Sequence, residues 1–309
     1  MSRIFVSGAT GVVGRRLVPR LIEAGHEVTA AGRDREKLQQ LERVGARAAA
    51  VDLFDPAAVL RAVEQAEVVC NLATAVPPPG PGMLLRRSWR AMDRVRREVS
   101  RNLVAAASAA GTVRRFVQES FAPIHEPAGD AWVTESAPVR PADYNRSVLE
   151  AESQAERFSR EGRVGVVLRF GLFYGPEDPP TSQLVDAVRR GWFPLPGRPE
   201  AYISWIAHDD AASAVVAALG VPAGTYNVVD DEPLRRRVLG EGVAGLLGVR
   251  PPRFLPGWLA PLAGAVGETM ARSLRISNRK MSQAGGWRPR YGTILDGLAD
   301  LISPPPKRR

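Results

Sequence analysis

The chain has 309 residues, of which 45% are hydrophobic and 24% charged, values that are ordinary for a soluble globular protein. No apolar stretch approaches the ~18 residues of a membrane-spanning helix, so no membrane association is expected. The net charge of +9 comes almost entirely from arginine, because only three of the 42 basic residues are lysines. This bias runs along the whole chain without a nucleic-acid-binding motif, so no nucleic-acid partner is expected.

The single cysteine, Cys70, excludes an internal disulfide and fits a reducing compartment. It lies in an apolar run that predicts a strand, which favours a buried, inert thiol. Three histidines and one cysteine argue against a zinc site, and no metal site is expected. The N-terminus enters a strand without a basic and then apolar leader, which argues against secretion. We therefore expect a cytoplasmic protein.

The N-terminal segment combines a strand, a glycine turn and a helix. Residues 4–6 form a short apolar run, typical of a strand buried on both faces. Gly8, Gly11 and Gly14 follow at three-residue spacing, and from Val12 apolar residues recur at helical spacing. Such a turn lies at a helix N-terminus, where free N–H groups and the helix dipole attract phosphate. We expect a pyrophosphate of a dinucleotide to bind here.

A second strand is expected over residues 26–31, followed by Gly32, Arg33 and Asp34. In dinucleotide-binding folds this strand end meets the adenosine ribose, where an acid holds the 2′-hydroxyl of NAD and arginine accommodates the 2′-phosphate of NADP. Arg33 therefore favours NADP, with NAD as the alternative. Asp34 would favour NAD, but its place before the next helix also suits it to be an N-cap.

Strands and helices then alternate, which predicts a parallel sheet covered by helices on both faces. Further strands are expected over 46–51, 67–73, 115–118 and 164–169, and helices over 56–65, 83–110 and 143–160. After residue 175 prolines interrupt the alternation, and two short strands are expected near 202–205 and 225–229. This change of composition marks a second, smaller region.

Seven arginines lie between residues 86 and 101, in the segment expected to be a long helix. The same segment carries an apolar stripe at Met92, Val95, Val99 and Leu103. We interpret the arginines as a solvated helix face, with binding of an acidic ligand or nucleic acid as the alternative.

Several motifs spread along the chain point to one family. They are Gly8-Ala-Thr-Gly-Val-Val-Gly14, Asp52-Leu53, Asn71-Leu72-Ala73, Ser120, Tyr144-Asn-Arg-Ser-Val148, Arg169-Phe-Gly-Leu-Phe-Tyr-Gly-Pro176 and Ser204-Trp-Ile-Ala-His-Asp-Asp210. With them the chain resembles the extended short-chain dehydrogenase/reductases, the NAD-dependent epimerase/dehydratase group, over nearly its whole length. The resemblance implies an α/β fold, with a Rossmann-like doubly wound parallel sheet and a smaller C-terminal substrate region.

On this resemblance, residues 1–175 would form the NAD(P)-binding domain, to which strands can return from the C-terminal part. Residues 176–302 would form a smaller mixed α/β substrate-binding region, and residues 303–309 a disordered tail. The resemblance further implies a cofactor site of twelve residues: Gly8, Thr10, Gly11, Val12 and Gly14 at the pyrophosphate, Arg33 at the ribose, Asp52 and Leu53 at the adenine, Leu72 and Ala73 across the sheet, and Phe170 and Leu172 near the nicotinamide.

Ser120 and Tyr144 would be the catalytic hydroxyl pair in this family. Tyr144 would exchange a proton with the substrate oxygen, and Ser120 would orient that oxygen. The family motif is Tyr-x-x-x-Lys, but Val148 occupies the lysine position. That lysine lowers the pKa of the phenol, which otherwise titrates near ~10, so the departure puts catalysis in doubt. Tyr144 and Ser120 could also have purely structural roles, as an aromatic packed on the sheet and a turn hydroxyl.

Three functions are compatible with these observations. The leading one is an NADP-dependent oxidoreductase that transfers hydride between the nicotinamide and a carbonyl or hydroxyl carbon of a small molecule. The second is an epimerase or dehydratase of a sugar-like substrate, and the third a non-catalytic NADP(H) sensor. Bulky residues of the C-terminal half, Trp192, Phe193, Trp205 and Trp258, indicate an apolar substrate. A homodimer is a further expectation from the resemblance.

Overall fold

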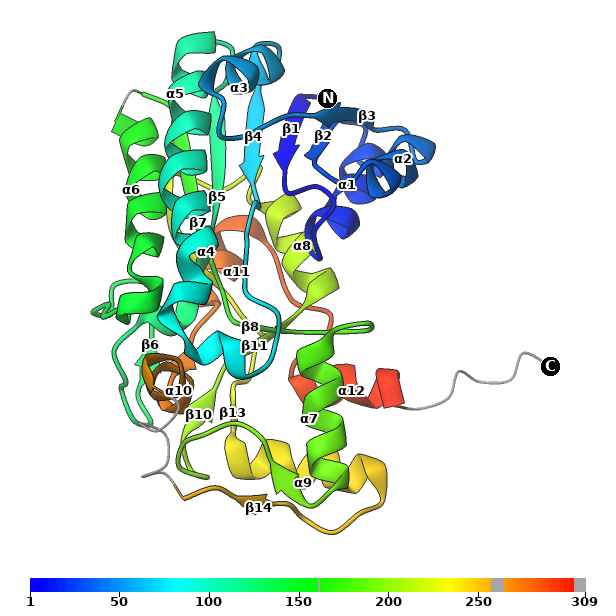
Figure 1. Cartoon of the computed structure of the whole chain (residues 1–309), viewed down its shortest axis with the longest axis vertical. Helices are drawn as coiled ribbons and strands as arrows, with labels where there is room; N and C mark the ends of the chain where they lie inside the picture. Colours follow the sequence, from blue (N-terminus) through cyan, green and yellow to red (C-terminus); the bar gives the residue numbers. More distant parts are fainter. Residues whose placement is uncertain (161, 257–263, 303–309) are drawn as a thin grey trace, which may run out of the picture.

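Within residues 1–160, 162–256 and 264–302, which the computed structural model describes, seven parallel strands form the central sheet (Figure 1). Their order is β12-β7-β5-β4-β1-β2-β3. The strands are β1 (Arg3–Ser7), β2 (Glu27–Gly32), β3 (Arg47–Ala50), β4 (Val68–Asn71), β5 (Arg115–Phe121), β7 (Val164–Phe170) and β12 (Gly224–Val228). The expected doubly wound α/β fold is confirmed.

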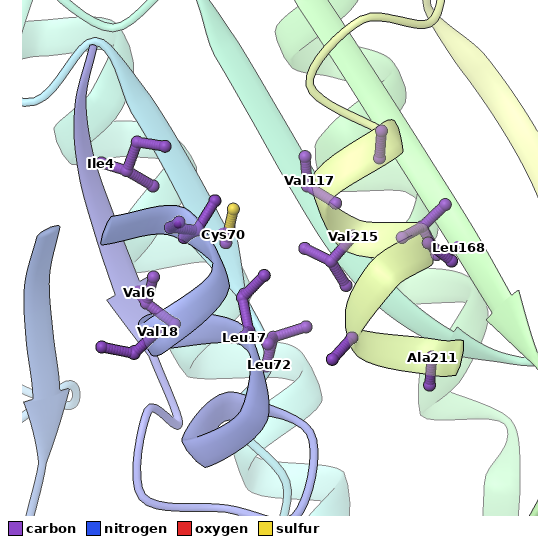
Figure 2. Close-up of a cluster of buried hydrophobic side chains, with 14 of the residues drawn as sticks. Ile4, Val6, Leu17, Val18, Cys70, Leu72, Val117, Leu168, Ala211 and Val215 are labelled. Atoms are coloured by element: carbon purple, nitrogen blue, oxygen red, sulfur yellow. The ribbon is translucent and has the colours of Figure 1, made fainter. Parts of the chain in front are cut away.

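Helices cover both faces of this sheet because consecutive strand residues point to opposite sides. One face carries α1 (Gly14–Glu23), α2 (Arg35–Arg43), α8 (His208–Ala217) and α11 (Arg279–Gly285), and the other carries α3 (Pro56–Val63), α5 (Ser100–Ala110) and α6 (Ser147–Arg160). Thus Val6 belongs to the first core and its neighbour Phe5 to the second. Figure 2 shows the first core, in which Leu17 and Val18 of α1 and Val215 of α8 pack on the strands.

Cys70 lies in this first core, where it is fully buried (Figure 2). Burial raises the pKa of its thiol to about 12, because the thiolate would lose its hydration. The expected burial of Cys70 is confirmed, and the raised pKa disfavours the reactive thiolate.

The C-terminal half does not form one continuous region, because α8 and β12 return to the sheet. The strand expected near residues 225–229 is β12, which pairs in parallel with β7 at the sheet edge. The remaining elements gather below the sheet in Figure 1: β8 (Leu172–Tyr174), α7 (Pro179–Arg189), β9 (Trp192–Phe193), β10 (Tyr202–Ile203), β11 (Trp205–Ala207), β13 (Leu234–Arg235), α9 (Arg236–Leu247), β14 (Arg253–Phe254), α10 (Gly264–Ala271), β15 (Arg275–Ile276) and α12 (Ile294–Ile302). The short β6 (Trp132–Val133) pairs with β15.

The single helix expected over residues 83–110 is wrong in its first half. The chain instead forms two 3₁₀ turns, η1 (Pro81–Leu84) and η2 (Arg86–Trp89), separated by the extended Leu85. It continues as α4 (Arg90–Arg94), a π-helical turn η3 (Val95–Val99) and then α5. Gly80 precedes the first turn and Gly82 lies within it, and glycine is a poor helix former.

No helix of the described ranges is long and apolar enough to cross a bilayer. The tail expected at residues 303–309 lies outside the described residues, and so does Trp258.

Candidate functional site

The glycine turn connects β1 to α1 at the carboxyl edge of the sheet. Gly8 has φ +70°, and a Cβ there would lie 2.5 Å from the carbonyl oxygen of Leu72. A Cβ on Gly14 would lie 2.3 Å from the Gly8 carbonyl oxygen, so neither position accepts a side chain. Around an added Cβ on the exposed Gly11, the Gly8 carbonyl oxygen at 3.1 Å is the single described atom within 4 Å. This turn is therefore closed at Gly8 and Gly14 and open at Gly11.

Such a turn fits the pyrophosphate of a dinucleotide. The positive end of the α1 dipole points to the turn, which favours a negatively charged group there. Val12 is exposed and Thr10 half-buried, with the Thr10 methyl against Gly32 at the end of β2. The expected residues thus form one continuous surface from the turn to the second strand end.

Arg33 is exposed immediately after β2, and it makes no ion pair within the described part of the chain. The neighbouring Asp34 is the N-cap of α2, accepts a hydrogen bond from the Lys37 amide at 3.2 Å and pairs with the Lys37 ammonium at 3.1 Å. These hydrogen bonds hold the pKa of Asp34 below its usual value. Asp34 therefore has the capping role that its sequence position suggests.

Four further predicted cofactor residues follow β3 and β4. Asp52 is exposed, and its carboxylate accepts a hydrogen bond of 2.9 Å from the Phe54 amide. The Leu53 carbonyl accepts from the Asn102 amide group at 3.1 Å. Leu72 and Ala73 continue β4 past the sheet edge, where the Leu72 amide donates to Ser7 on β1. The carboxyl ends of parallel strands meet at one edge, so these residues and the glycine turn share it.

Phe170 and Leu172 occupy the same edge on the other side of the sheet. Phe170 is the buried last residue of β7, and Leu172 is the half-buried first residue of β8. Gly171 separates them, and its amide donates to Val228 of β12.

Ser120 lies in a buried polar network rather than on an open surface. Its hydroxyl donates to a Glu152 carboxylate oxygen at 2.5 Å, and Arg169 donates to both oxygens of the same carboxylate at 2.8 and 2.7 Å. Ser120, Glu152 and Arg169 are all buried. The hydroxyl can donate one hydrogen bond, and Glu152 accepts it. This arrangement differs from the expected one, in which Ser120 donates to a substrate oxygen.

Tyr144 lies in a separate buried cluster. Its ring packs against Trp89 of η2 with 4.5 Å between centroids, and Met92 completes the buried group. Figure 1 places α10 beside this region, and α10 packs against η1, η4 (Ala122–Ile124) and η5 (Asp143–Asn145), the turn that contains Tyr144. No direct contact joins Tyr144 to Ser120 among the described interactions.

Val148, at the position of the family lysine, is fully buried in the first turn of α6. A lysine there would bring a cation into a site without access to water. The adjacent Ser147 donates to Asp93 at 2.6 Å, and the exposed Arg146 pairs with Asp143 at 3.0 Å. None of these residues supplies a cation to Tyr144.

Arg96 supplies that cation, and it is a residue that the sequence interpretation missed. It is the buried member of the arginine run, whereas the other six arginines are exposed. Its guanidinium donates to the Asn145 side chain and lies 3.8 Å from a Glu119 carboxylate oxygen. Its position four residues after Met92 and three before Val99 places it on the apolar stripe. That spacing is the signal by which it could have been found.

The electrostatics of Tyr144 reflect these neighbours. Burial raises the pKa of the Tyr144 phenol, while the nearby Thr269 hydroxyl and the charges of Arg96 and Arg272 counteract part of the rise. Burial also raises the pKa of Glu119, against the opposing charge of Arg96. Tyr144 is consequently protonated at neutral pH, with guanidinium groups near enough to favour its phenolate.

Three buried polar atoms around Tyr144 have no hydrogen-bond partner within the described ranges. They are Arg96 Nε, Asn145 Nδ2 and Glu119 Oε2. Buried polar atoms of this kind are costly unless water or a ligand meets them, so their gathering is typical of a binding site. Glu119 too was missed by the sequence interpretation, although it directly precedes Ser120 at the end of β5.

Of the bulky residues expected to line the substrate site, the three that the structure describes do not belong to the Tyr144 cluster. Phe193 and Trp205 are buried in a third core with residues of α7, α9 and α12, and Trp192 is exposed. Their burial stabilises the C-terminal elements, because large apolar side chains contribute most when they are withdrawn from water.

Comparisons with known proteins identify the family of the chain. The model of the NAD dependent epimerase/dehydratase family matches residues 4–228. The chain is 35% identical to a Streptomyces protein named 3-diazoavenalumate denitrifying reductase, over 96% of this chain and 99% of that protein. It is 28% identical to a Shewanella oneidensis protein named 2-alkyl-3-oxoalkanoate reductase, over 89% of this chain and 74% of that protein.

Solved structures share the fold. UDP-glucuronic acid 4-epimerase from Bacillus cereus, solved with UDP-glucuronic acid and NAD, has a TM-score of 0.77 at 18% identity, covering 97% of this chain and 98% of its own. Together with the family match and the 35% identical relative, the fold and the glycine turn establish the relationship. The chain belongs to the NAD-dependent epimerase/dehydratase family, the extended short-chain dehydrogenase/reductases, and its cofactor is a nicotinamide adenine dinucleotide.

Proposed function

We propose that the protein is an NADP(H)-dependent reductase that acts on a carbonyl group of a small molecule, with Tyr144 as the proton donor. The observation that carries this proposal is the buried Tyr144 phenol, which is protonated at neutral pH and near two arginines. Reduction of a carbonyl needs a hydride on carbon and a proton on oxygen. When bound, the nicotinamide supplies the hydride.

Tyr144 would donate its proton to the carbonyl oxygen as negative charge develops there. The carbonyl C=O π bond becomes a C–H and an O–H single bond, and the phenol becomes phenolate. Arg96 and Arg272 favour that phenolate electrostatically, the task of the family lysine, and water then returns the proton. Because burial raises the pKa of the phenol, donation is favoured over abstraction, so the site suits reduction better than oxidation.

Arg33 supports NADP over NAD as the cofactor. It is exposed at the end of β2 without an ion pair in the described ranges, whereas Asp34, the acid that would serve NAD, is occupied as the N-cap of α2. A guanidinium is suited to bidentate contact with a 2′-phosphate.

The named relatives support the direction of the reaction. Two aligned proteins, at 35% and 28% identity, are both named as reductases. Ser120 is not assigned to substrate contact in this mechanism, because its hydroxyl donates its hydrogen bond to Glu152.

The test is NADPH consumption by the purified protein with a panel of aldehydes, ketones and 3-oxo acids. The parent should consume NADPH, and Tyr144→Phe should abolish turnover while leaving NADPH binding intact. Tyr291→Phe is the matched control, because this hydroxyl donates to Asp300 at 2.9 Å, away from the Tyr144 cluster. Retained turnover in Tyr144→Phe would remove this residue from the mechanism.

Two other outcomes would point to the alternatives. A protein that binds NADPH but consumes none with any compound would favour a non-catalytic sensor. Conversion of a sugar nucleotide without net consumption of the cofactor would favour an epimerase or dehydratase.

A further inference from the structure

A buried arginine lies outside the groups that the proposed mechanism uses. Arg236 begins α9 and is one of the largest fully buried side chains in the described chain. Burial lowers the pKa of its guanidinium to about 10, so it keeps its charge at neutral pH. A buried cation is costly unless a negative charge or several hydrogen bonds compensate it.

The hydrogen bonds of Arg236 satisfy one of its three nitrogens. Nη2 donates to the carbonyl oxygens of Met270 at 2.5 Å and Arg272 at 3.3 Å, at the end of α10. This contact caps the negative end of the α10 dipole. Nε and Nη1 have no partner in the described ranges. Capping of α10 therefore accounts for Nη2 of Arg236 and leaves its Nε and Nη1 donors without a partner in the described ranges.

The other buried arginines of the described chain show what Arg236 lacks. Arg169 forms a bidentate pair with Glu152, and Arg96 lies 3.8 Å from Glu119. For Arg236, desolvation alone shifts the pKa, with no contribution from any described carboxylate. Two of the three buried arginines thus have an internal carboxylate, and Arg236 has none.

Arg236 lines a narrow cavity that adjoins the Tyr144 site. Leu172, Ser204, Thr269 and Arg272 also line it. Thr269 lies on α10, which packs against the turn that contains Tyr144, and both Thr269 and Arg272 act on the pKa of Tyr144. Leu172 belongs to the segment expected near the nicotinamide. The cavity volume is about 20 Å³. One water needs roughly 10–15 Å³ of such volume, so the cavity has room for a small polar group, such as a carboxylate oxygen, beside the guanidinium.

We propose that Arg236 binds the carboxylate of the substrate in this cavity, so that the molecule reduced at Tyr144 is a small organic acid. This inference rests on the proposed reductase function for its reaction, but the binding site follows from the contacts of Arg236. A carboxylate would accept charge-assisted hydrogen bonds from the guanidinium and replace the missing internal counter-ion. Arg272, whose guanidinium donates to the carbonyls of Pro123, His125 and Arg140, adds a second positive charge at the same cavity.

The test compares two ligands of equal size that differ in charge, 3-phenylpropionate and 3-phenylpropionamide. Ligand-observed NMR titration of the NADPH-bound protein measures both dissociation constants without turnover. The parent should bind the acid at least about tenfold more tightly than the amide. Equal binding of the two ligands by the parent would overturn the proposal, whatever any variant does.

Variants then assign the preference to Arg236. Arg236→Met should bind the acid no more tightly than the amide, with the affinity for the amide unchanged. Arg236→Lys should keep part of the preference for the acid. Arg237→Met is the matched control, because Arg237 is the next residue, exposed, and paired with Glu200 at 2.7 Å. An undiminished preference in folded Arg236→Met would overturn the assignment. If that variant does not fold, Arg236→Gln, which keeps donors without charge, takes its place.

Failure of this proposal can be distinguished from failure of the proposed function. If the parent protein does not bind NADPH or does not turn it over, that result contradicts the reductase function alone. A parent that reduces neutral carbonyl compounds, yet shows no preference for the acid over the amide, would be a reductase without the carboxylate site.

Discussion

Arg96 donates a hydrogen bond to the side chain of Asn145, the residue that follows Tyr144 in the chain. The contact brings a cation from the π-helical turn η3 to a phenol more than forty residues away in sequence. A π-helical turn inserts a residue into a helix and occurs often at functional sites. In the family motif the positive charge near the tyrosine belongs to a lysine four residues later in the chain. In this structure a guanidinium from another segment, η3, brings a positive charge to Tyr144.

Replacing Arg96 should change the pH dependence of turnover. Without its charge the pKa of Tyr144 rises further, so alcohol oxidation, which needs the phenolate, should begin at higher pH in Arg96→Met than in the parent. Arg272 and Thr269 act on the same phenol and remain in place. The measurement is the rate of NADP⁺ reduction as a function of pH.

Two controls accompany the Arg96 variant. Arg96→Lys should return the alkaline limb towards that of the parent. Arg96→Met leaves the buried Glu119 carboxylate without its cation, which can unfold the protein. The double variant Arg96→Met with Glu119→Gln removes that carboxylate charge, so a change in its pH profile reports the effect of Arg96 on Tyr144. An unchanged pH profile in a folded Arg96→Met protein would exclude Arg96 from this role.

Gly11→Val should abolish dinucleotide binding without unfolding the protein. A Cβ at Gly11 would meet one described atom, the Gly8 carbonyl oxygen at 3.1 Å, so a shift of a few tenths of an ångström accommodates it. The valine side chain would fill the approach of the pyrophosphate. Calorimetric titration with NADPH measures the effect. Gly245→Val is the control, since no described atom would contact its Cβ within 4 Å and it lies in α9. Tight binding by Gly11→Val would show that the site lies elsewhere.

Arg33→Ala should weaken NADPH much more than NADH, because NADPH alone carries the 2′-phosphate. A charge-assisted bidentate contact is worth ~1.5–3 kcal/mol, which corresponds to a loss of about tenfold or more. Dissociation constants for both cofactors are compared in the parent, in Arg33→Ala and in Arg43→Ala, an exposed arginine at the other end of α2. Equal losses for the two cofactors would contradict the assignment.

Ser120→Ala should cost stability rather than catalysis. The variant removes a hydrogen bond to the buried Glu152 carboxylate, which keeps its bidentate pair with Arg169, so a loss of about 1–2 kcal/mol in the free energy of unfolding is expected. Denaturant unfolding measures that loss, and the turnover number is compared with the parent. A drop in turnover of about a hundredfold or more in the folded variant would instead assign Ser120 to the substrate oxygen.

Asp230 should make the protein less stable as pH rises. Burial raises the pKa of this carboxyl well above its usual value, and nearby Asp210 raises it further. The unfolded carboxyl ionises near ~3.9, whereas the folded one keeps its proton to higher pH. The contribution of Asp230 to the free energy of unfolding is therefore most favourable below the pKa of the unfolded carboxyl. It declines as pH increases towards the pKa of the folded carboxyl.

Asp230→Asn should remove this part of the pH dependence and raise the melting temperature at neutral pH relative to the parent. Glu232→Gln is the control, because this nearby carboxylate is exposed. Parallel curves of melting temperature against pH for the parent and Asp230→Asn would show that Asp230 ionises normally in the folded state.

The amino-acid sequence by itself determined the fold and the glycine turn at which we expect the cofactor to bind. Consecutive apolar residues in the strands, helical periodicity and three glycines are local patterns, and local geometry places a glycine turn at a helix N-terminus wherever strand and helix flank it. The same holds for Asp34, whose capping role depends on the residue three positions later.

Tertiary structure decided the catalytic and substrate half. Ser120 and Tyr144 resemble a family pair in sequence, yet the partners that set their chemistry, Glu152 and Arg96, come from other elements. Likewise, Arg236 looks like one more residue of an arginine-rich chain until packing buries it without a carboxylate. Burial and charge pairing depend on which helices and strands contact one another in the folded protein. The spacing of residues in the sequence does not specify those contacts.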